Sequence, residues 1–251
     1  MIKLLSVSVT ENPDDENVEI IVDSGTMLAQ IATVFKHSQP HHERYIPCLN
    51  LIANISNANS TAANKFIERG ADGLLLKQIT QSLQVYKIEK RLFREGDMVS
   101  IQDQIKASQS LAAQITTLGG LLQSDNEGYR IRILADPIVM YMIEIMSHDR
   151  HEIILLTAVC TFALDLFECV ELRDDPVFME PFAEMTGYLT HIMPYLGFEY
   201  YPRLLEQAQF YHDNSANASD EVEQALNDPL QHIFEYEDRD DMDEDEKASI
   251  V

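Results

Sequence analysis

The sequence contains no tryptophan, few basic residues and no long apolar run. Its 251 residues include 18 lysines and arginines against 42 aspartates and glutamates, for a net charge of −24. This charge repels nucleic acid and anionic membranes and attracts basic protein surfaces. No run of 18 apolar residues occurs, and the first residues do not resemble a signal peptide. We therefore expect a cytoplasmic protein, with the nucleus as a second location, that binds neither nucleic acid nor membrane.

Cysteine is also scarce. Cys48, Cys160 and Cys169 each lie inside an apolar helical pattern, and no CxxC pair occurs. Closely spaced cysteine pairs are typical of metal sites, and disulfides belong to secreted chains. We therefore expect three buried, reduced thiols.

Histidine clusters occur in two predicted turns, at 37–42 and 148–151, without carboxylates or thiols at metal-ligand spacing. We interpret them as exposed turn residues. The sequence also has no nucleophile paired with a base, no phosphate-binding glycine loop and no HExxH motif. These absences predict a protein without catalytic activity, metal or cofactor.

Apolar residues make up 45% of the chain, and their spacing is helical rather than alternating. The sequence therefore predicts an all-α protein through about residue 212. Gly25 and Gly70 lie 45 residues apart, each after a short helical pattern, and we interpret both as left-handed helix stops. We place a further stop at Gly119 and Gly120. A period in the forties is typical of armadillo and HEAT repeats.

A second internal match relates residues 27–56 to residues 138–167 at a constant offset of 111. Apolar positions coincide along both segments, as listed here: Ile31 with Met142, Val34 with Ile145, Cys48 with Val159, Ile52 with Ala163 and Ile55 with Leu166. Ser38 and Asp149 also coincide, and we predict both as helix N-caps. Two related helix–turn–helix units follow, separated by an altered or inserted unit at about 80–128.

The segments "VEIIVDSGTM" and "CLNLIANISNANSTAANKFIERGADGLLLKQI" resemble armadillo repeats, and among these the repeats of importin-alpha, the nuclear-import adaptor family. The resemblance covers residues 4–79, with a weaker echo over 130–193. It implies a right-handed α-solenoid, which we place at residues 1–212. It also implies a concave groove that binds an extended basic peptide.

In that family the third helix of each repeat carries a Trp and, four residues later, an Asn that binds the peptide backbone. Asn54 matches the Asn, whereas the Trp position holds Asn50. In the second unit the pair is Thr161 and Asp165. The resemblance thus implies partner binding by these four residues, without an aromatic wall for lysine side chains. The basic N-terminal arm that binds importin-beta is also missing from the sequence.

The last part of the sequence differs in composition. Residues 213–251 predict one loose helix and then an acidic tail, and residues 235–251 alone contribute −7 of the net charge. Such a tail cannot bury enough apolar area to fold, so we expect disorder. Its end, "ASIV", supplies Ser249 and Val251, the hydroxyl and terminal apolar side chain that a PDZ domain binds.

Two functions from different classes remain. The first is a non-enzymatic adaptor or scaffold, similar to a nuclear-import adaptor, that binds a protein or an extended basic peptide in its groove. The second is a regulator of a chaperone or GTPase that grips a folded partner. A peptide adaptor needs polar, acidic residues on its concave face, whereas a regulator needs an exposed apolar patch.

Overall fold

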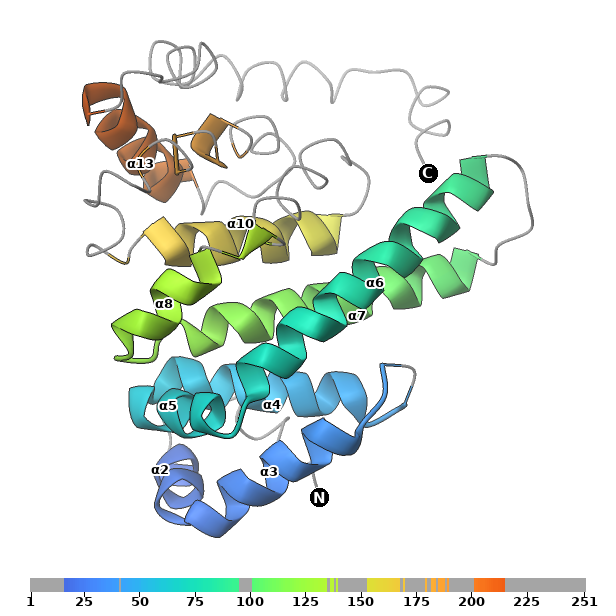
Figure 1. Cartoon of the computed structure of the whole chain (residues 1–251), viewed down its shortest axis with the longest axis vertical. Helices are drawn as coiled ribbons and strands as arrows, with labels where there is room; N and C mark the ends of the chain where they lie inside the picture. Colours follow the sequence, from blue (N-terminus) through green and yellow to red (C-terminus); the bar gives the residue numbers. More distant parts are fainter. Residues whose placement is uncertain are drawn as a thin grey trace. The chain divides into compact units, whose positions relative to one another are not determined.

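The computed structural model is built from helices (Figure 1). It describes residues 16–40, 42–94, 101–134, 153–167 and 201–214, together with isolated positions between 136 and 139, at 169 and 179, and from 182 to 189. No strand occurs in these ranges, so the prediction of an all-helical protein is confirmed. None of the described helices is long and apolar enough to cross a membrane.

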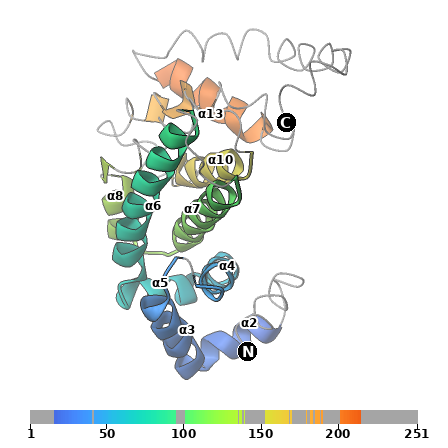
Figure 2. The same cartoon turned by 90° about the vertical axis from the view of Figure 1, so that its right-hand side faces the viewer.

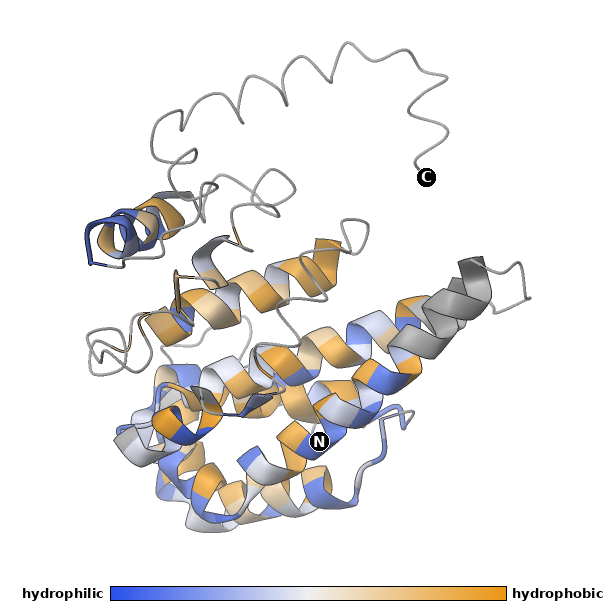
Figure 3. Cartoon of the chain, turned by 45° about the horizontal axis from the view of Figure 1, so that its top comes forward, coloured by the Kyte–Doolittle hydropathy of each residue, from blue (hydrophilic) through white to orange (hydrophobic). Residues whose placement is uncertain are grey.

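The helices follow one another with short connections. In chain order they are α2 (Glu16–Asp23), α3 (Gly25–His37), α4 (Tyr45–Ala58), α5 (Ser60–Glu68), α6 (Ala71–Arg94), α7 (Ile101–Leu121), α8 (Glu127–Leu134), α10 (Ile153–Phe167) and α13 (Tyr201–Asn214). Polar and apolar residues share most of these helices, as amphipathic packing requires (Figure 3). Contacts divide the chain into two compact units, residues 1–172 and 173–251.

The first unit is organised around α7. This helix packs against α4 on one side and α10 on the other, and it also contacts α6. Seen nearly end-on, α4, α7 and α10 form one column, with α6 and α8 alongside (Figure 2). A short helix followed by two longer ones occurs as α2–α3–α4 and again as α5–α6–α7. Two members of the column, α4 and α7, are therefore the last helices of successive groups.

Buried residues support the internal match at an offset of 111. Cys48, Ile52 and Ile55 of α4 are fully buried, and so are their counterparts Val159, Ala163 and Leu166 of α10. The matching apolar positions thus form part of the buried core in both helices. The other two matched pairs involve Met142 and Ile145, which lie outside the described residues.

Two of the predicted helix signals are wrong. Gly25 is the first residue of α3 rather than a left-handed stop, because the Ser24 side chain caps this helix by accepting a hydrogen bond from the backbone of Met27. Ser38 follows α3 instead of starting the next helix, and its hydroxyl donates to the carbonyl oxygen of Val34 at 2.7 Å. Ser24 thus bonds to the helix that follows it, and Ser38 bonds to the helix that precedes it, whereas we predicted the opposite arrangement at each place.

The prediction for Gly70 is confirmed. Gly70 follows α5 with a φ of 78°, the only positive φ among the described residues. The Asn59 side chain begins the same short helix by accepting a hydrogen bond from the backbone of Ala62 at 3.0 Å. An Asn cap and a glycine stop explain why this segment forms a helix of only nine residues.

The predicted end of a helix at Gly119 and Gly120 is confirmed to within one residue, because α7 ends at Leu121, but neither glycine has a positive φ. A Cβ added to Gly120 would lie 2.9 Å from the Ala53 carbonyl oxygen in α4, and one added to Gly119 would lie 3.6 Å from the Phe162 ring in α10. The glycine pair therefore lets α7 approach both of its neighbours closely.

A buried polar cluster joins α4, α6 and α7. The Tyr45 hydroxyl donates to Gln78 Oε1 at 2.7 Å, and Gln114 Nε2 donates to the Tyr45 oxygen at 2.8 Å and to Ser82 Oγ at 3.0 Å. Thr117 adds a bond from α7 to the carbonyl oxygen of Leu49 at 3.1 Å. Buried polar groups are costly unless paired, so this cluster fixes the registers of the three helices relative to one another.

An ion pair fastens α8 to the start of α6. The guanidinium of Arg132 bonds to the carboxylate of Asp72, which is buried, and its Cζ lies 5.7 Å from the centre of the Tyr129 ring. Asp72 also lies in the first turn of α6, where a negative charge is favoured by the helix dipole. The pair therefore ties α8 to the group formed by α5, α6 and α7.

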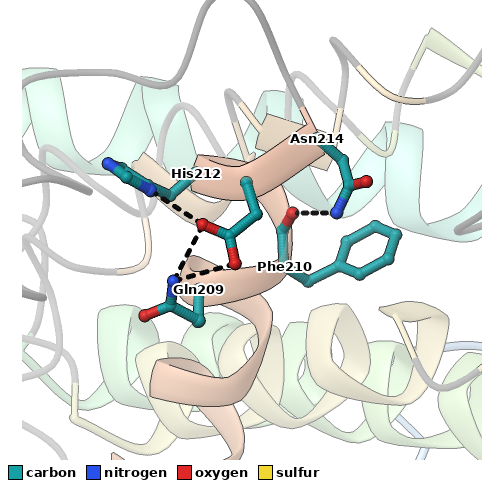
Figure 4. A network of polar contacts seen from close by, with 5 residues as sticks. Gln209, Phe210, His212 and Asn214 are labelled. Carbon is teal, nitrogen blue, oxygen red and sulfur yellow. Dashed lines mark hydrogen bonds and ion pairs between the residues drawn. The ribbon is translucent and has the colours of Figure 1, made fainter.

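The second unit contains α13. At its C-terminal end Gln209 Nε2 donates to both carboxylate oxygens of Asp213, and His212 Nδ1 lies 3.1 Å from one of them (Figure 4). The Gln209 amide, and then His212, hold the pKa of the exposed Asp213 below its usual range. The predicted boundary at 212–213 stays a prediction. The predicted tail and the "ASIV" end lie outside the described residues.

Candidate functional site

An open groove runs across the column of α4, α7 and α10. Its volume is about 580 Å³, which lies within the range of ligand-binding clefts. All three helices contribute to it. The lining residues are Ile46 and Asn50 of α4, Gln109, Ala112, Ala113 and Thr116 of α7, and Ile153, Ile154, Thr157, Ala158 and Thr161 of α10.

Helical spacing brings these side chains to one face. Ile153, Thr157 and Thr161 are four residues apart along α10, and Gln109 and Thr116 lie two turns apart on α7. The opposite faces of α7 and α10 belong to the hydrophobic core. Leu111 and Leu118 of α7 and Leu156 of α10 are buried there. Ala112 and Ala113 stand in the middle and leave the floor of the groove shallow and smooth.

The groove carries no charge on its described lining. All 11 lining residues are aliphatic, hydroxyl-bearing or amide-bearing. The exposed amides of Asn50 and Gln109 make no hydrogen bond within the described part of the chain. Each amide can both donate and accept hydrogen bonds, so the pair offers uncommitted polar groups to a ligand.

One end of the groove is distinctly apolar. Ile153 and Ile154, which line the groove at the start of α10, are 60% and 59% exposed. Large aliphatic side chains gain free energy when they are covered, at about 25 cal/mol per Å² of apolar area removed from water. The start of α10 is thus a surface that favours contact with another apolar group.

Two of the four predicted site residues line the groove, and two do not. Asn50 and Thr161 line the groove from opposite helices. Asn54 and Asp165 lie one turn further along α4 and α10, are only partly exposed, and are not lining residues. Both already interact with other parts of the chain. The open part of the groove is therefore one helical turn closer to the helix N-termini than the Asn54–Asp165 level.

Polar side chains of both neighbouring helices lie close to the glycine pair of α7. Asp165 Oδ2 would lie 3.4 Å from a Cβ at Gly119, and Asn57 Oδ1 would lie 3.1 Å from one at Gly120. Two polar side chains thus reach over the glycine pair of α7 from its neighbouring helices. On α10 the lining of the groove ends at Thr161, one turn before this level.

The contribution of α7 was missed by the sequence analysis. Gln109 and Thr116 lie in the segment that we interpreted as an altered unit, for which no internal match gave an equivalent position. The exposure of Ile153 and Ile154 could have been predicted from the sequence. They precede Leu155 and Leu156, and four consecutive apolar residues cannot all point to one face of a helix.

A second, smaller concavity lies beside the turn between α3 and α4. It has a volume of about 280 Å³ and is lined by Thr33, Val34, His37, Ser38, His42 and Arg44. His37 and His42 are exposed, as predicted for turn residues, while His41, His148 and His151 lie outside the described residues. In the part of the chain that the structure describes, no three metal-ligating side chains come together.

Comparison with known proteins gives no relative. No protein-family model matches the sequence, and neither a curated protein nor a solved structure matches it significantly. The function must therefore be inferred from the groove itself.

Proposed function

We propose that this protein is a non-enzymatic adaptor or scaffold of the armadillo type, which binds a segment of another protein in the groove formed by α4, α7 and α10. The observation that carries the proposal is the groove's continuity across three packed helices, with an open, uncharged lining. Repeat proteins use such extended concave surfaces for binding.

The solenoid architecture is part of the same proposal. Two groups of short, long and long helices support it, as do the stacking of α4, α7 and α10 and the repeat of buried positions after 111 residues. We propose that α8 opens a third group that ends with α10. The likeness to importin-alpha in the sequence of α4 suggests a nuclear-import adaptor as one specific form of this function.

A second candidate function has an observation of its own. The exposed Ile153 and Ile154 favour a regulator that grips an apolar patch on a folded partner, such as a chaperone or a GTPase. The two candidates differ in what contacts the groove. An adaptor binds one extended segment, whereas a regulator binds residues that are distant in the partner's sequence.

Site-specific photo-crosslinking tests the proposal. A photoreactive amino acid replaces Thr157 inside the groove or, as a matched control, the exposed Thr80 on α6, and crosslinked partner peptides are identified by mass spectrometry in cell lysate. We expect adducts from position 157 that map to one continuous segment of each partner. Adducts scattered over a folded domain would favour the regulator, and equal adducts from both positions would contradict binding in the groove.

A direct titration tests the import-adaptor form. A basic nuclear-localisation-type peptide is titrated into wild type, Asn54→Ala and Asp165→Ala. Weaker binding by both variants would support this form. Equal binding by all three proteins, or no binding by wild type, would exclude it and leave an adaptor for another kind of segment.

A further inference from the structure

The groove's chemistry differs from what a basic peptide requires. A lysine or arginine side chain that binds there meets no counter-charge, because all 11 described lining residues are neutral. Covering part of an unpaired charge costs hydration free energy that nothing in the lining returns. The negative charge of the whole chain attracts cations to its surface generally, but it does not provide a partner at this place.

Acidic ligands are disfavoured for a different reason. The chain carries a net charge of −24, so an acidic segment is repelled before it reaches the groove. The groove also lacks a lysine or arginine among its described lining residues, so nothing there compensates the repulsion. Neutral segments remain as the ligands that this surface accommodates without an electrostatic cost.

The lining matches both parts of an extended neutral segment. Ile46, Ile153 and Ile154 offer aliphatic contacts for side chains. The uncommitted amides of Asn50 and Gln109 can each pair with a backbone N–H and a backbone C=O, which are the groups that every extended segment exposes. Thr116 and Thr157 add hydroxyl groups between them.

The dimensions set the length of the segment. Packed helices lie about 8–10 Å apart, so three adjacent helices span about 16–20 Å between their axes. An extended chain advances about 3.3 Å per residue, and this distance therefore takes five or six residues. Alternate side chains of such a segment face the groove, so about three of them contact its floor.

We infer that the groove binds an uncharged, extended segment of a partner protein, five or six residues long, with aliphatic side chains at alternate positions. This inference rests on the proposed function, and it names the chemical class of the ligand. It assigns the contacts to Asn50, Gln109 and the isoleucines of α10. The Asn54–Asp165 level, to which the family resemblance pointed, lies beyond the end of the binding surface.

Selection from a phage-displayed library of random peptides tests the inference. The full chain is the bait, Thr157→Arg is the variant that fills and charges the groove, and Thr80→Arg is the matched control on an exposed position of α6. We expect enrichment of uncharged peptides with alternating Val, Ile or Leu. Their affinity, measured by fluorescence anisotropy, should fall at least tenfold in Thr157→Arg and stay unchanged in Thr80→Arg.

The other outcomes are distinguishable. Enrichment of Lys- or Arg-rich peptides that Thr157→Arg no longer binds would overturn the inference and leave the proposed function intact. Enrichment of peptides that match this chain's own sequence would identify an internal segment or a second copy as the occupant, and would also overturn it. Finding no peptide whose binding depends on position 157 would contradict both the inference and the proposed function.

A second variant asks the same question by gain of function. Thr116→Asp and Thr157→Asp together place two carboxylates in the groove. If the neutral lining is what rejects cationic peptides, the double variant should bind an oligolysine peptide at least tenfold more tightly than wild type at low salt. Equal binding of oligolysine by both proteins would show that the groove does not discriminate by charge, and would overturn the inference.

Discussion

A methyl group at Gly120 would lie 2.9 Å from the carbonyl oxygen of Ala53 and 3.0 Å from its Cα. These are backbone atoms, so α7 and α4 must move apart to accept it. We expect Gly120→Ala to lower the free energy of unfolding by about 1–3 kcal/mol, despite the better helix propensity of alanine. Unfolding in urea, followed by circular dichroism, measures the change.

The matched control is Gly73→Ala in the first turn of α6. A Cβ at Gly73 meets nothing within 4 Å, so only the propensity of the residue changes there. We expect this variant to gain up to about 1 kcal/mol. A Gly120→Ala variant as stable as Gly73→Ala would show that the two helices are not in close contact.

The Cys48 thiol is fully buried and lies 3.7 Å from the carbonyl oxygen of Ile31. Burial raises the pKa of this thiol to about 12, from 9.0. The neutral thiol is therefore favoured in the folded protein, and its contribution to stability is present below pH 9 and lost as the pH rises towards 12. We expect Cys48→Ala to lose less stability than wild type over this interval in denaturant titrations.

Thiol labelling checks the same property more simply. All three cysteines are buried, so a disulfide reagent at pH 8 should react slowly with the folded protein and fully after unfolding. Rapid labelling of the native chain at Cys48 would contradict its burial.

The outcome at single residues shows what sequence patterns can and cannot specify. Gly70 was predicted correctly, because a short helix followed by glycine and a new apolar pattern leaves few alternatives. Gly25 also follows a short apolar helical pattern, yet Ser24 caps the following helix and makes a left-handed residue unnecessary. At Gly119 and Gly120 the helix end was predicted to within one residue, but the close packing of the two glycines was not. Their role depends on Ala53 and Phe162, which are far away in the sequence.

Between the helices, Tyr45 is the centre of the buried cluster that joins α4, α6 and α7. Its hydroxyl donates to Gln78 and accepts from Gln114. Removing it in Tyr45→Phe leaves two buried amides short of a partner. We expect a loss of about 1–3 kcal/mol in the free energy of unfolding, measured by urea denaturation.

Tyr129→Phe is the comparison for this change. The Tyr129 hydroxyl is also buried, but it has no hydrogen-bond partner among the described residues. Phenylalanine keeps the ring beneath Arg132 and removes the unpaired oxygen, so we expect no loss of stability or a small gain. Equal losses in both variants would mean that the Tyr45 hydrogen bonds contribute nothing specific.

At the level of elements, the sequence correctly predicted a short helix that stops at Gly70, which is α5 between α4 and α6. Its boundaries are marked by Asn59 and Gly70, which act locally. The groove was predicted less completely. The internal match located α4 and α10 and so found Asn50 and Thr161, whereas α7 had no match that aligned its exposed residues. Only the packing of α7 between the other two helices reveals that Gln109 and Thr116 face the same space.

The whole molecule carries far more negative than positive charge, and this excess opposes compaction. Added salt screens the repulsion, because the screening length falls to about 8 Å at physiological ionic strength. We expect the melting temperature at pH 7 to rise as sodium chloride increases from low salt to about 0.15 M. Differential scanning calorimetry measures this shift.

The same titration near pH 4.5 is the control. The sequence has its isoelectric point there, so net repulsion vanishes and the melting temperature should respond little to salt. A larger salt response at pH 4.5 than at pH 7 would contradict an origin in net charge. The prediction of an all-helical fold does not depend on the net charge, because it was made from the spacing of apolar residues.

The glycine pair of α7 also affects how flexibly α4, α7 and α10 pack against one another. At Gly120 backbone meets backbone, and backbone atoms have no alternative rotamers with which to absorb a change of angle. At Gly119 the neighbours include the side chains of Phe162 and Asp165, which can readjust. We therefore expect α4 and α7 to move together as one rigid body. Changes of angle between helices should occur mainly at the contact between α7 and α10, so the groove would widen on the α10 side.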